Sequence, residues 1–419
     1  MLNIETLTAV EILDSRARPT LAVTAGLLGG VTARAGVPSG ASTGSREARE
    51  LRDGDKARFG GLGVLRAAGH VNGEIATALC DRSFTSLAEL DAALIELDGT
   101  PDKTRLGANA TVGVSMAVAR AIAVAAGLPL WQSLAPAGVT PRLPVPHFNV
   151  VNGGVHAPNR LDFQEFMLAP LGAPTVAEAV RAGAEVYAAL RGQLTGLGLS
   201  TGLGDEGGFA PEIDSPEEVL ALLVTAIEAA GYQTGRDGIA IALDPAASEF
   251  YSGGAYRVAG QTLSSDEMIE RYAEMTVRFP VWSIEDGLAE SDWDGWQRLI
   301  ARLGDRTQIV GDDLLVTNPA IICEAIERKA ANAALIKLNQ IGTVTETLEA
   351  MRLCREAGWA QMVSHRSGET EDTFIADLAV ASGCGQIKSG APARGERTAK
   401  YNRLIEIEAV AHLPYGLAG

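Results

Sequence analysis

Residues 239–244, Ile-Ala-Ile-Ala-Leu-Asp, form a short apolar run that ends in a carboxylate. A short run followed by a charged or histidine side chain recurs five more times before the end of the chain. The six side chains that end these runs are Asp244, Glu285, Asp312, Lys337, His365 and Lys388, spaced 41, 27, 25, 28 and 23 residues apart. Such short apolar runs are typical of strands buried on both faces.

Helix signals fill the intervals between these runs. Ser264-Ser-Asp-Glu267 has the residues of a capping box, and Ser215-Pro216-Glu217-Glu218 places a cap, an N1 proline and acidic residues in the preferred order. The alternation predicts a (β/α)₈ TIM barrel with its active site at the carboxyl ends of the strands. An open doubly wound sheet would give the same alternation. We favour the barrel because closure brings six charged strand ends to one centre.

The first part of the chain has a different pattern. Residues 7–13, 20–25 and 31–37 are expected to form a strand meander, and Thr111–Ala126 an Ala-rich helix that stops before Gly127. Four prolines between positions 136 and 146 mark the best domain boundary. We therefore expect an α/β protein with an N-terminal α+β domain at 1–135 and a barrel domain at 136–419.

Composition excludes several classes of protein. Lys and Arg number 35 and Asp and Glu 52, so the net charge of −17 repels nucleic acids and anionic membranes. An anionic substrate would need a local group of cations or a metal. Four scattered cysteines form no CxxC pair, which favours reduced thiols in the cytoplasm over a zinc site. We expect no signal peptide, and no membrane span in the longest uncharged stretch, because glycine and proline interrupt it.

The acidic strand ends predict a metal site. Asp244, Glu285 and Asp312 would repel one another in a buried centre unless a cation lay between them, and an all-oxygen ligand set indicates Mg²⁺. Each could instead be a helix cap or a surface charge. Lys337 and Lys388 follow two later strands. A lysine beside a metal and a second lysine loses its proton readily and can act as a base, although a structural salt bridge is the alternative.

Other stretches supply further candidates, each of which could also be an ordinary loop. His365-Arg366-Ser367 suits a phosphate group, and Asp205-Glu206 before two glycines could supply an acid. His156 and Glu165 are additional candidates. The loop at residues 37–44, Val-Pro-Ser-Gly-Ala-Ser-Thr-Gly, is not a P-loop but could close over a bound anion.

Taken together, these stretches resemble the enolase (phosphopyruvate hydratase) family. The matching segments cover nearly the whole chain and include PSGASTG at 38–44, LGANATVGVSMAVARA at 106–121, NGGVHA at 152–157, GDEGGFAP at 204–211, SIEDGLAESDWDGW at 283–296, GDDLLVTNP at 311–319, LIKLNQIGTVTETL at 335–348, SHRSGETEDTFIADLAVA at 364–381 and GQIKSGAPARGERTAKYN at 385–402. The resemblance implies an N-terminal domain capping a barrel that begins ββαα.

The resemblance also implies a reaction, the reversible dehydration of 2-phosphoglycerate to phosphoenolpyruvate in glycolysis and gluconeogenesis, with two Mg²⁺ per active site. It implies Asp244, Glu285 and Asp312 as ligands of the first metal and Ser42 as a ligand of the second. Lys337 would be the base that removes the C2 proton, in keeping with the lysine or histidine bases of enolase-superfamily sites.

The remaining roles follow from the same resemblance. Glu206 would be the acid that assists loss of the C3 hydroxyl, with support from Glu165, and His156 would close over the substrate. The implied substrate contacts are His365, Arg366 and Ser367 for the phosphate and Lys388 for the carboxylate. The family also implies a homodimer or larger homo-oligomer, with Arg16 paired to Glu406 or Glu408 of another subunit.

Some residues depart from the family pattern. Ala17-Arg18 follows Asp14-Ser15-Arg16 where Gly-Asn is usual, and His147-Phe148 stands where many members have Met-Met. The chain could therefore be a specialised copy of actinobacterial type, a lyase of secondary metabolism that acts on a modified phospho- or phosphono-analogue of 2-phosphoglycerate. A non-catalytic scaffold protein is a third hypothesis, but a scaffold has no need of the retained polar residues.

Overall fold

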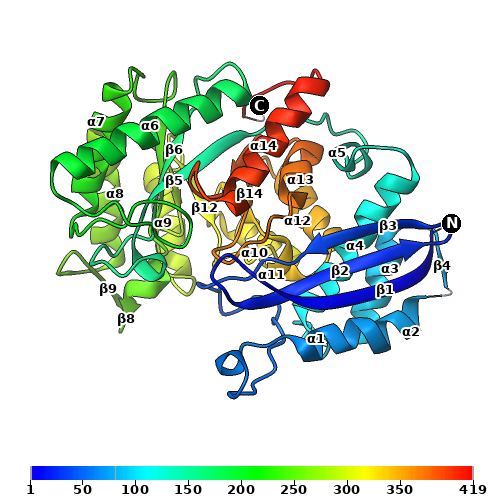
Figure 1. Ribbon diagram of the computed structural model, residues 1–419. Helices are drawn as coiled ribbons and strands as arrows, with labels where there is room; N and C mark the ends of the chain where they lie inside the picture. The colour runs from blue at the N-terminus through cyan, green and yellow to red at the C-terminus, as the bar shows by residue number, and fades with distance from the viewer. Residues whose placement is uncertain (1, 81, 418–419) are drawn as a thin grey trace.

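The computed structural model describes residues 2–80 and 82–417. An antiparallel sheet forms the N-terminal part, in the order β3-β2-β1-β4, and is blue in Figure 1. Its strands are β1 Leu2–Leu13, β2 Pro19–Leu27, β3 Val31–Gly36 and β4 Ser83–Phe84. The long hairpin pairs Val10 with Ala22, and β2 pairs with β3 beyond the Gly29-Gly30 turn, so the predicted meander is confirmed.

Helices pack against this sheet. They are α1 Leu65–His70, the π-helical turn Val71–Ile75, α2 Ala76–Leu79, α3 Leu87–Asp98, α4 Ala108–Ala125 and α5 Leu130–Ser133, with a 3₁₀ turn at Phe59–Gly61. Helix α4 confirms the predicted Thr111–Ala126 helix, but it begins three residues earlier and ends at Ala125, with Ala126 as its C-cap. It is apolar and long enough to cross a membrane, but 78% of it is buried in the protein. Its apolar surface is therefore the core of the N-terminal domain.

Eight strands close into the barrel, in the order β5-β6-β7-β11-β12-β13-β14-β15. They are β5 Val145–Asn152, β6 Glu165–Ala169, β7 Ala240–Asp244, β11 Val281–Glu285, β12 Gln308–Gly311, β13 Ala333–Ile336, β14 Ala360–Ser364 and β15 Gln386–Lys388. Strand β6 is antiparallel to both neighbours, and every other pairing is parallel. This confirms the closed barrel and its ββαα start.

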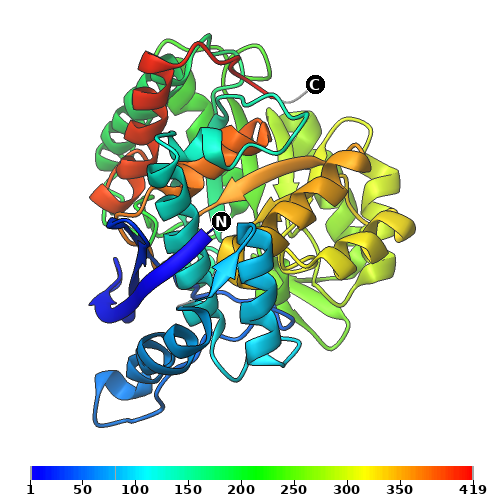
Figure 2. The same cartoon turned by 90° about the vertical axis from the view of Figure 1, so that its right-hand side faces the viewer.

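The barrel helices lie outside the strands, as Figures 1 and 2 show. They are α6 Val176–Gly196, α7 Pro216–Ala229, α8 Ser265–Arg278, α9 Trp293–Leu303, α10 Pro319–Arg328, α11 Leu338–Ile341, α12 Val344–Glu356, α13 Phe374–Ser382 and α14 Gly395–Val410. A small sheet of β8 Tyr251–Ser252, β9 Ala255–Val258 and β10 Gln261–Leu263, and 3₁₀ turns at Gly154–His156 and Ala247–Phe250, complete the described elements.

Of the two predicted helix N-caps, one forms and the other does not. The capping box is present: the Ser264 hydroxyl accepts from Glu267 N, and the Glu267 carboxylate accepts from Ser264 N at 2.7 Å. Ser215 does begin α7, but its hydroxyl donates to Glu217 at 2.9 Å and does not cap the helix. The nearby carboxylate is a stronger acceptor for the hydroxyl, and the helix start relies on Pro216.

Side chains from the N-terminal domain cap a barrel helix. The α3 residue Asp91 accepts from Thr345 N at 3.0 Å and from the Ser115 hydroxyl at 3.0 Å, and Ser115 accepts from Val344 N at 2.9 Å. These bonds satisfy amide groups in the first turn of α12, which otherwise lack partners inside the helix. The two domains are therefore joined at a helix that begins seven residues after Lys337.

Candidate active site

The carboxyl ends of the barrel strands surround one small cavity. Eleven of the twelve residues predicted for the site line it: Ser42, His156, Glu165, Glu206, Asp244, Asp312, Lys337, His365, Arg366, Ser367 and Lys388. The open space among them is about 20 Å³, little more than a water molecule needs, because charged side chains fill the rest. The twelfth residue, Glu285, is buried beside the cavity and contacts Lys388.

The Lys388 ammonium lies among three carboxylates. Its Nζ atom is 2.7 Å from Glu285 Oε1, 3.0 Å from Asp244 Oδ2 and 3.1 Å from Glu165 Oε1. Burial and the neighbouring Asp244 raise the pKa of Glu285 well above its usual range. The second oxygen, Glu285 Oε2, is buried and has no hydrogen-bond partner among the described residues. A centre that already surrounds a cation with carboxylate oxygens, one of them unused, fits a hard divalent metal.

The second lysine is paired with the third predicted metal ligand. Lys337 Nζ forms an ion pair with Asp312 Oδ2, while Asp312 Oδ1 accepts from Gln340 at 2.8 Å. Burial lowers the pKa of Lys337, but Asp312 and Glu285 together raise it above its usual range. The expectation of a readily deprotonated Lys337 assumed a bound metal, so the metal-free protein does not test it. Loss of the Lys337 proton requires another cation to take over the charge of Asp312.

Two glutamates flank a histidine on the opposite side of the cavity. His156 Nδ1 lies 3.9 Å from Glu165 and 3.7 Å from Glu206. Burial and the nearby Glu206 raise the pKa of Glu165 well above its usual range. Burial would also raise the pKa of Glu206, but His365, His156 and Arg397 hold it well below that range. The two pKa values shift in opposite directions, so Glu165 is the more readily protonated of the two glutamates.

Arg397 determines the tautomer of His365. This fully buried arginine in α14 donates to His365 Nδ1 and also to the carbonyls of Arg366 and Ser367, both at 2.6 Å. A guanidinium has no acceptor, so Nδ1 must accept and the ring proton must be on Nε2. Nε2 faces Glu206 at 3.2 Å, and burial lowers the pKa of His365 to about 3. The ring is therefore a neutral donor facing Glu206.

The loop at residues 38–44 is attached to the predicted phosphate-binding residues. Ala41 N donates to the Ser367 hydroxyl at 2.7 Å, and Ser39 and Gly368 exchange backbone hydrogen bonds at 2.8 Å. A Cβ atom at Gly40 would lie 2.0 Å from Arg366 Nη2, so only glycine leaves space for that guanidinium. Ser42 reaches the cavity, but its hydroxyl donates to Glu249 at 3.2 Å.

A buried ion pair holds Arg366. Its Nη1 and Nη2 atoms each donate to the Glu47 carboxylate at 3.0 Å, and Nη1 also donates to Asn339 at 3.0 Å. Glu47 comes from the N-terminal domain, so both domains build this part of the site. Gln340 donates to Glu47 at 3.2 Å and also to Asp312. It therefore links the Arg366–Glu47 ion pair to the Lys337–Asp312 ion pair.

Arg16 lies against the predicted phosphate-binding residue Ser367. Its side chain is only 5% exposed and donates to the Ser367 hydroxyl at 3.0 Å and to Ser39 O at 3.1 Å. Glu408 accepts from the first amides of α6, at 2.7 Å from Val176 N. Arg16 and Glu408 thus have partners within the chain, whereas Glu406 is 67% exposed. The pairing of Arg16 with Glu406 or Glu408 of another subunit stays a prediction.

Sequence reasoning assigned no role to several residues that shape the site. Asp286 accepts from the backbone amides of Asp312 and Asp313 at 2.9 and 2.8 Å, and Asn149 donates to Glu206 at 2.9 Å. Arg397, Gln340 and Asp286 lie inside the quoted GERTAKYN, LNQIG and SIEDG segments, so proximity to a strand end could have marked two of them. Arg397 carried no such signal, since it comes from the middle of a helix-forming segment.

Comparison with known proteins agrees with this geometry. Residues 4–134 match the model of the enolase N-terminal domain, and residues 140–413 match the enolase C-terminal TIM barrel domain. The chain is 56% identical over 400 residues to an enolase of Rubrobacter xylanophilus, covering 95% of this chain and 93% of that protein. It is also 56% identical to enolase 1 of Methylococcus capsulatus, covering 97% of both. The chain belongs to the enolase family.

Proposed function

We propose that this protein is a Mg²⁺-dependent hydro-lyase that reversibly converts 2-phosphoglycerate to phosphoenolpyruvate. The observation that carries the proposal is the position of the charged strand ends, which surround one cavity in a chain 56% identical to enolases over nearly its whole length. The cavity offers basic groups for a phosphorylated carboxylate and acidic groups for a metal.

The metal ligands that we propose are Asp244, Glu285 and Asp312 for one Mg²⁺, with Ser42 contributing to a second. The unused, buried Glu285 Oε2 supports this choice. Bound Mg²⁺ supplies positive charge to the substrate carboxylate, which becomes a dianion when the C2 proton leaves. Ser42 must exchange its present partner, Glu249, to take part.

We assign proton transfer to Lys337 and to the glutamate pair. Lys337 removes the C2 proton, and its ammonium must first lose the stabilisation that Asp312 provides. Glu206 acts as the acid in departure of the C3 hydroxyl, supported by Glu165, which is the more readily protonated of the two. His156 closes this side of the cavity. Each acid or base contributes about 10²- to 10⁴-fold to the rate.

Substrate charge is met by four further side chains in this proposal. His365, Arg366 and Ser367 bind the phosphate, and Lys388 binds the carboxylate. Arg366 and Lys388 are both at most 3% exposed, so each exchanges buried carboxylate partners for substrate oxygens on binding. Buried cations in water-poor surroundings bind anions more strongly than exposed ones do.

The alternative substrate, a modified phospho- or phosphono-analogue, is not favoured by identity of this extent to enolases. A non-catalytic scaffold is also disfavoured, because acid, base and metal-binding groups converge. The test is formation of phosphoenolpyruvate from 2-phosphoglycerate, followed by absorbance. We expect kcat/KM between about 10⁴ and 10⁸ M⁻¹s⁻¹, loss of turnover in EDTA and recovery with Mg²⁺. Full activity in EDTA, or kcat/KM several orders lower, would contradict the proposal.

We further propose a homodimer or larger homo-oligomer in the cytoplasm. Leu13 at the end of β1 is 57% exposed and lies at the edge of a cleft of about 1350 Å³ between the N-terminal domain and α14, and Val10 on the same strand is 55% exposed. Apolar side chains at such an edge favour contact with another subunit. Light scattering at micromolar concentration checks this, and a monomer there would refute it.

A further inference from the structure

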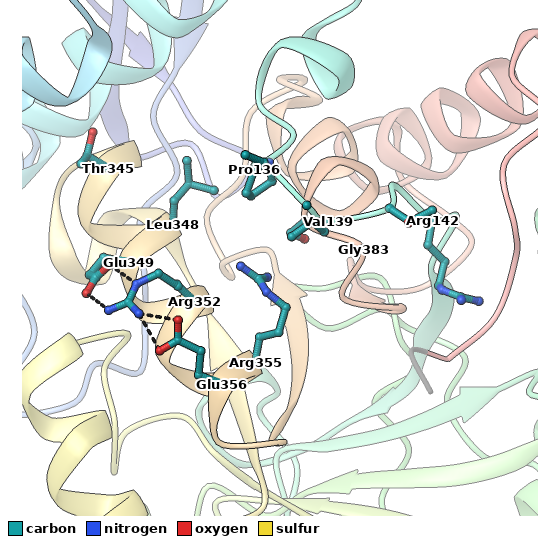
Figure 3. A pocket seen from close by; sticks show the side chains of 14 residues that line it. Pro136, Val139, Arg142, Thr345, Leu348, Glu349, Arg352, Arg355, Glu356 and Gly383 are labelled. Atoms are coloured by element: carbon teal, nitrogen blue, oxygen red, sulfur yellow. Dashed lines mark hydrogen bonds and ion pairs between the residues drawn. The ribbon is translucent and has the colours of Figure 1, made fainter.

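A second cavity lies on the flank of the barrel, away from the strand ends that hold the active site. It has a volume of about 780 Å³, within the range of small-molecule sites. Figure 3 shows its walls: α12, the segment from Pro136 to Arg142 that connects the domains, and the turn at Gly383 after α13. None of the residues assigned to catalysis lines this cavity.

Three arginines and two glutamates line this cavity, and the two glutamates are already occupied. Arg352 donates to both oxygens of Glu349 at 2.7 and 2.8 Å and to both oxygens of Glu356 at 2.6 Å. The dashed lines in Figure 3 mark these pairs. Arg352 with its two glutamates carries a net charge of −1, so Arg142 and Arg355 bring the cavity to a net charge of +1.

The other two arginines lack a carboxylate partner within residues 2–80 and 82–417. Arg142 has one long hydrogen bond, 3.5 Å from Nη1 to Tyr415 O. Arg355 is half-buried, and its Nη1 atom is completely buried without a hydrogen-bond partner. In Figure 3 the Arg355 side chain extends from α12 toward Pro136 and Val139. A buried guanidinium group without an acceptor is unfavourable, so it calls for a bound water or anion.

We propose that this cavity binds a small anion through Arg355, with Arg142 adding positive charge. A guanidinium matches the geometry of a phosphate or carboxylate group, because it can donate two parallel hydrogen bonds. The side chains of Pro136, Val139 and Leu348 provide apolar contacts for the rest of the ligand. With a net charge of −17, the protein repels anions elsewhere, so binding depends on these direct contacts.

Isothermal titration in EDTA tests the proposal, with inorganic phosphate and citrate as separate probes. Phosphate can also bind at Arg366 in the active site, so two phosphate sites are expected in the unaltered chain. We expect Arg355→Gln to weaken the flank site at least tenfold, and Arg142→Gln to weaken it by a smaller factor. The active-site event should persist in both, which shows that the variants are folded.

The matched control is Arg302→Gln, which removes the same charge from an exposed arginine paired with Glu270 on a distant helix. It should leave both phosphate sites unchanged. Tighter binding of citrate than phosphate would identify a carboxylate ligand, and the reverse a phosphate ligand. The proposal is overturned if both probes bind Arg355→Gln as they bind the unaltered chain. Arg355 would then serve only as a favourable charge at the end of α12, and its variant would merely lower Tm.

Discussion

Asp91 gives a quantitative prediction for the contact between the two domains. It is fully buried and bonded to the Ser115 hydroxyl and to both the amide and the hydroxyl of Thr345. Burial raises the pKa of Asp91 to about 6, because the hydrogen bonds only partly replace water. Replacing Asp91 with Asn keeps an acceptor oxygen and removes the ionisable group.

Protonation of Asp91 stabilises the folded protein, because burial raises the pKa of this group. The folded-state pKa of Asp91 lies above the unfolded value of 3.8, so the folded protein binds more protons between these values. Stability contributed by this group therefore increases as pH falls through 6 and levels off below about 4. A shift of about two units corresponds to about 3 kcal/mol in total, of which about 1.4 kcal/mol develops between pH 7 and pH 5.

Urea unfolding at pH 7 and pH 5 in EDTA measures the effect. For each protein, the free energy of unfolding at pH 7 is subtracted from that at pH 5. This change should be about 1.4 kcal/mol larger for the unaltered chain than for Asp91→Asn. All other titrating groups are common to both proteins and cancel. Asp91→Ala provides the complementary variant. It leaves three buried donors without an acceptor, at a cost of about 1–3 kcal/mol each, and should destabilise the folded protein at both pH values. Identical pH dependence for the unaltered chain and Asp91→Asn would refute the reasoning.

Three further predictions concern the active site. In Lys337→Ala, exchange of the C2 hydrogen with D₂O and product formation should both fall by at least about 10²-fold. Glu206→Gln should retain this exchange but form little product. NMR measures the exchange, and the opposite pattern would reverse the two roles. Arg397→Lys should lower kcat about 10- to 100-fold, because the His365 ring is no longer held in one tautomer. The ¹⁵N chemical shifts of the ring should then change, and unchanged shifts would contradict this role of Arg397. Gly40→Ala should raise KM by displacing a phosphate-binding guanidinium, and an unchanged KM would show that the loop can move.

The alternating strand pattern was readable in the sequence because its physical cause is local. Barrel strands are buried on both faces, so each is a short apolar run, and Asp244, Glu285 and Lys388 interrupt that pattern where the strands end. The capping box at Ser264 was equally local, since its two partners are three residues apart. The proposed metal ligands and the two lysines are predictable in this way.

The contacts between those residues depend on long-range packing. Nothing near Arg397 in the sequence indicates that it determines the tautomer of His365, 32 residues away. The pairing of Arg366 with Glu47 joins residues 319 positions apart, and the bond from Arg16 to Ser367 joins residues 351 positions apart.

The sequence by itself determined which side chains end the strands, because apolar periodicity and helix caps act over a few residues. Only the tertiary structure decided which charges meet. Closure of the barrel and docking of the N-terminal domain bring distant groups within about 3 Å of one another in buried surroundings, where the ionisation of each group depends on its neighbours. Lys337 shows the difference: its position was predictable, but the direction of its pKa shift depended on Asp312 being its partner.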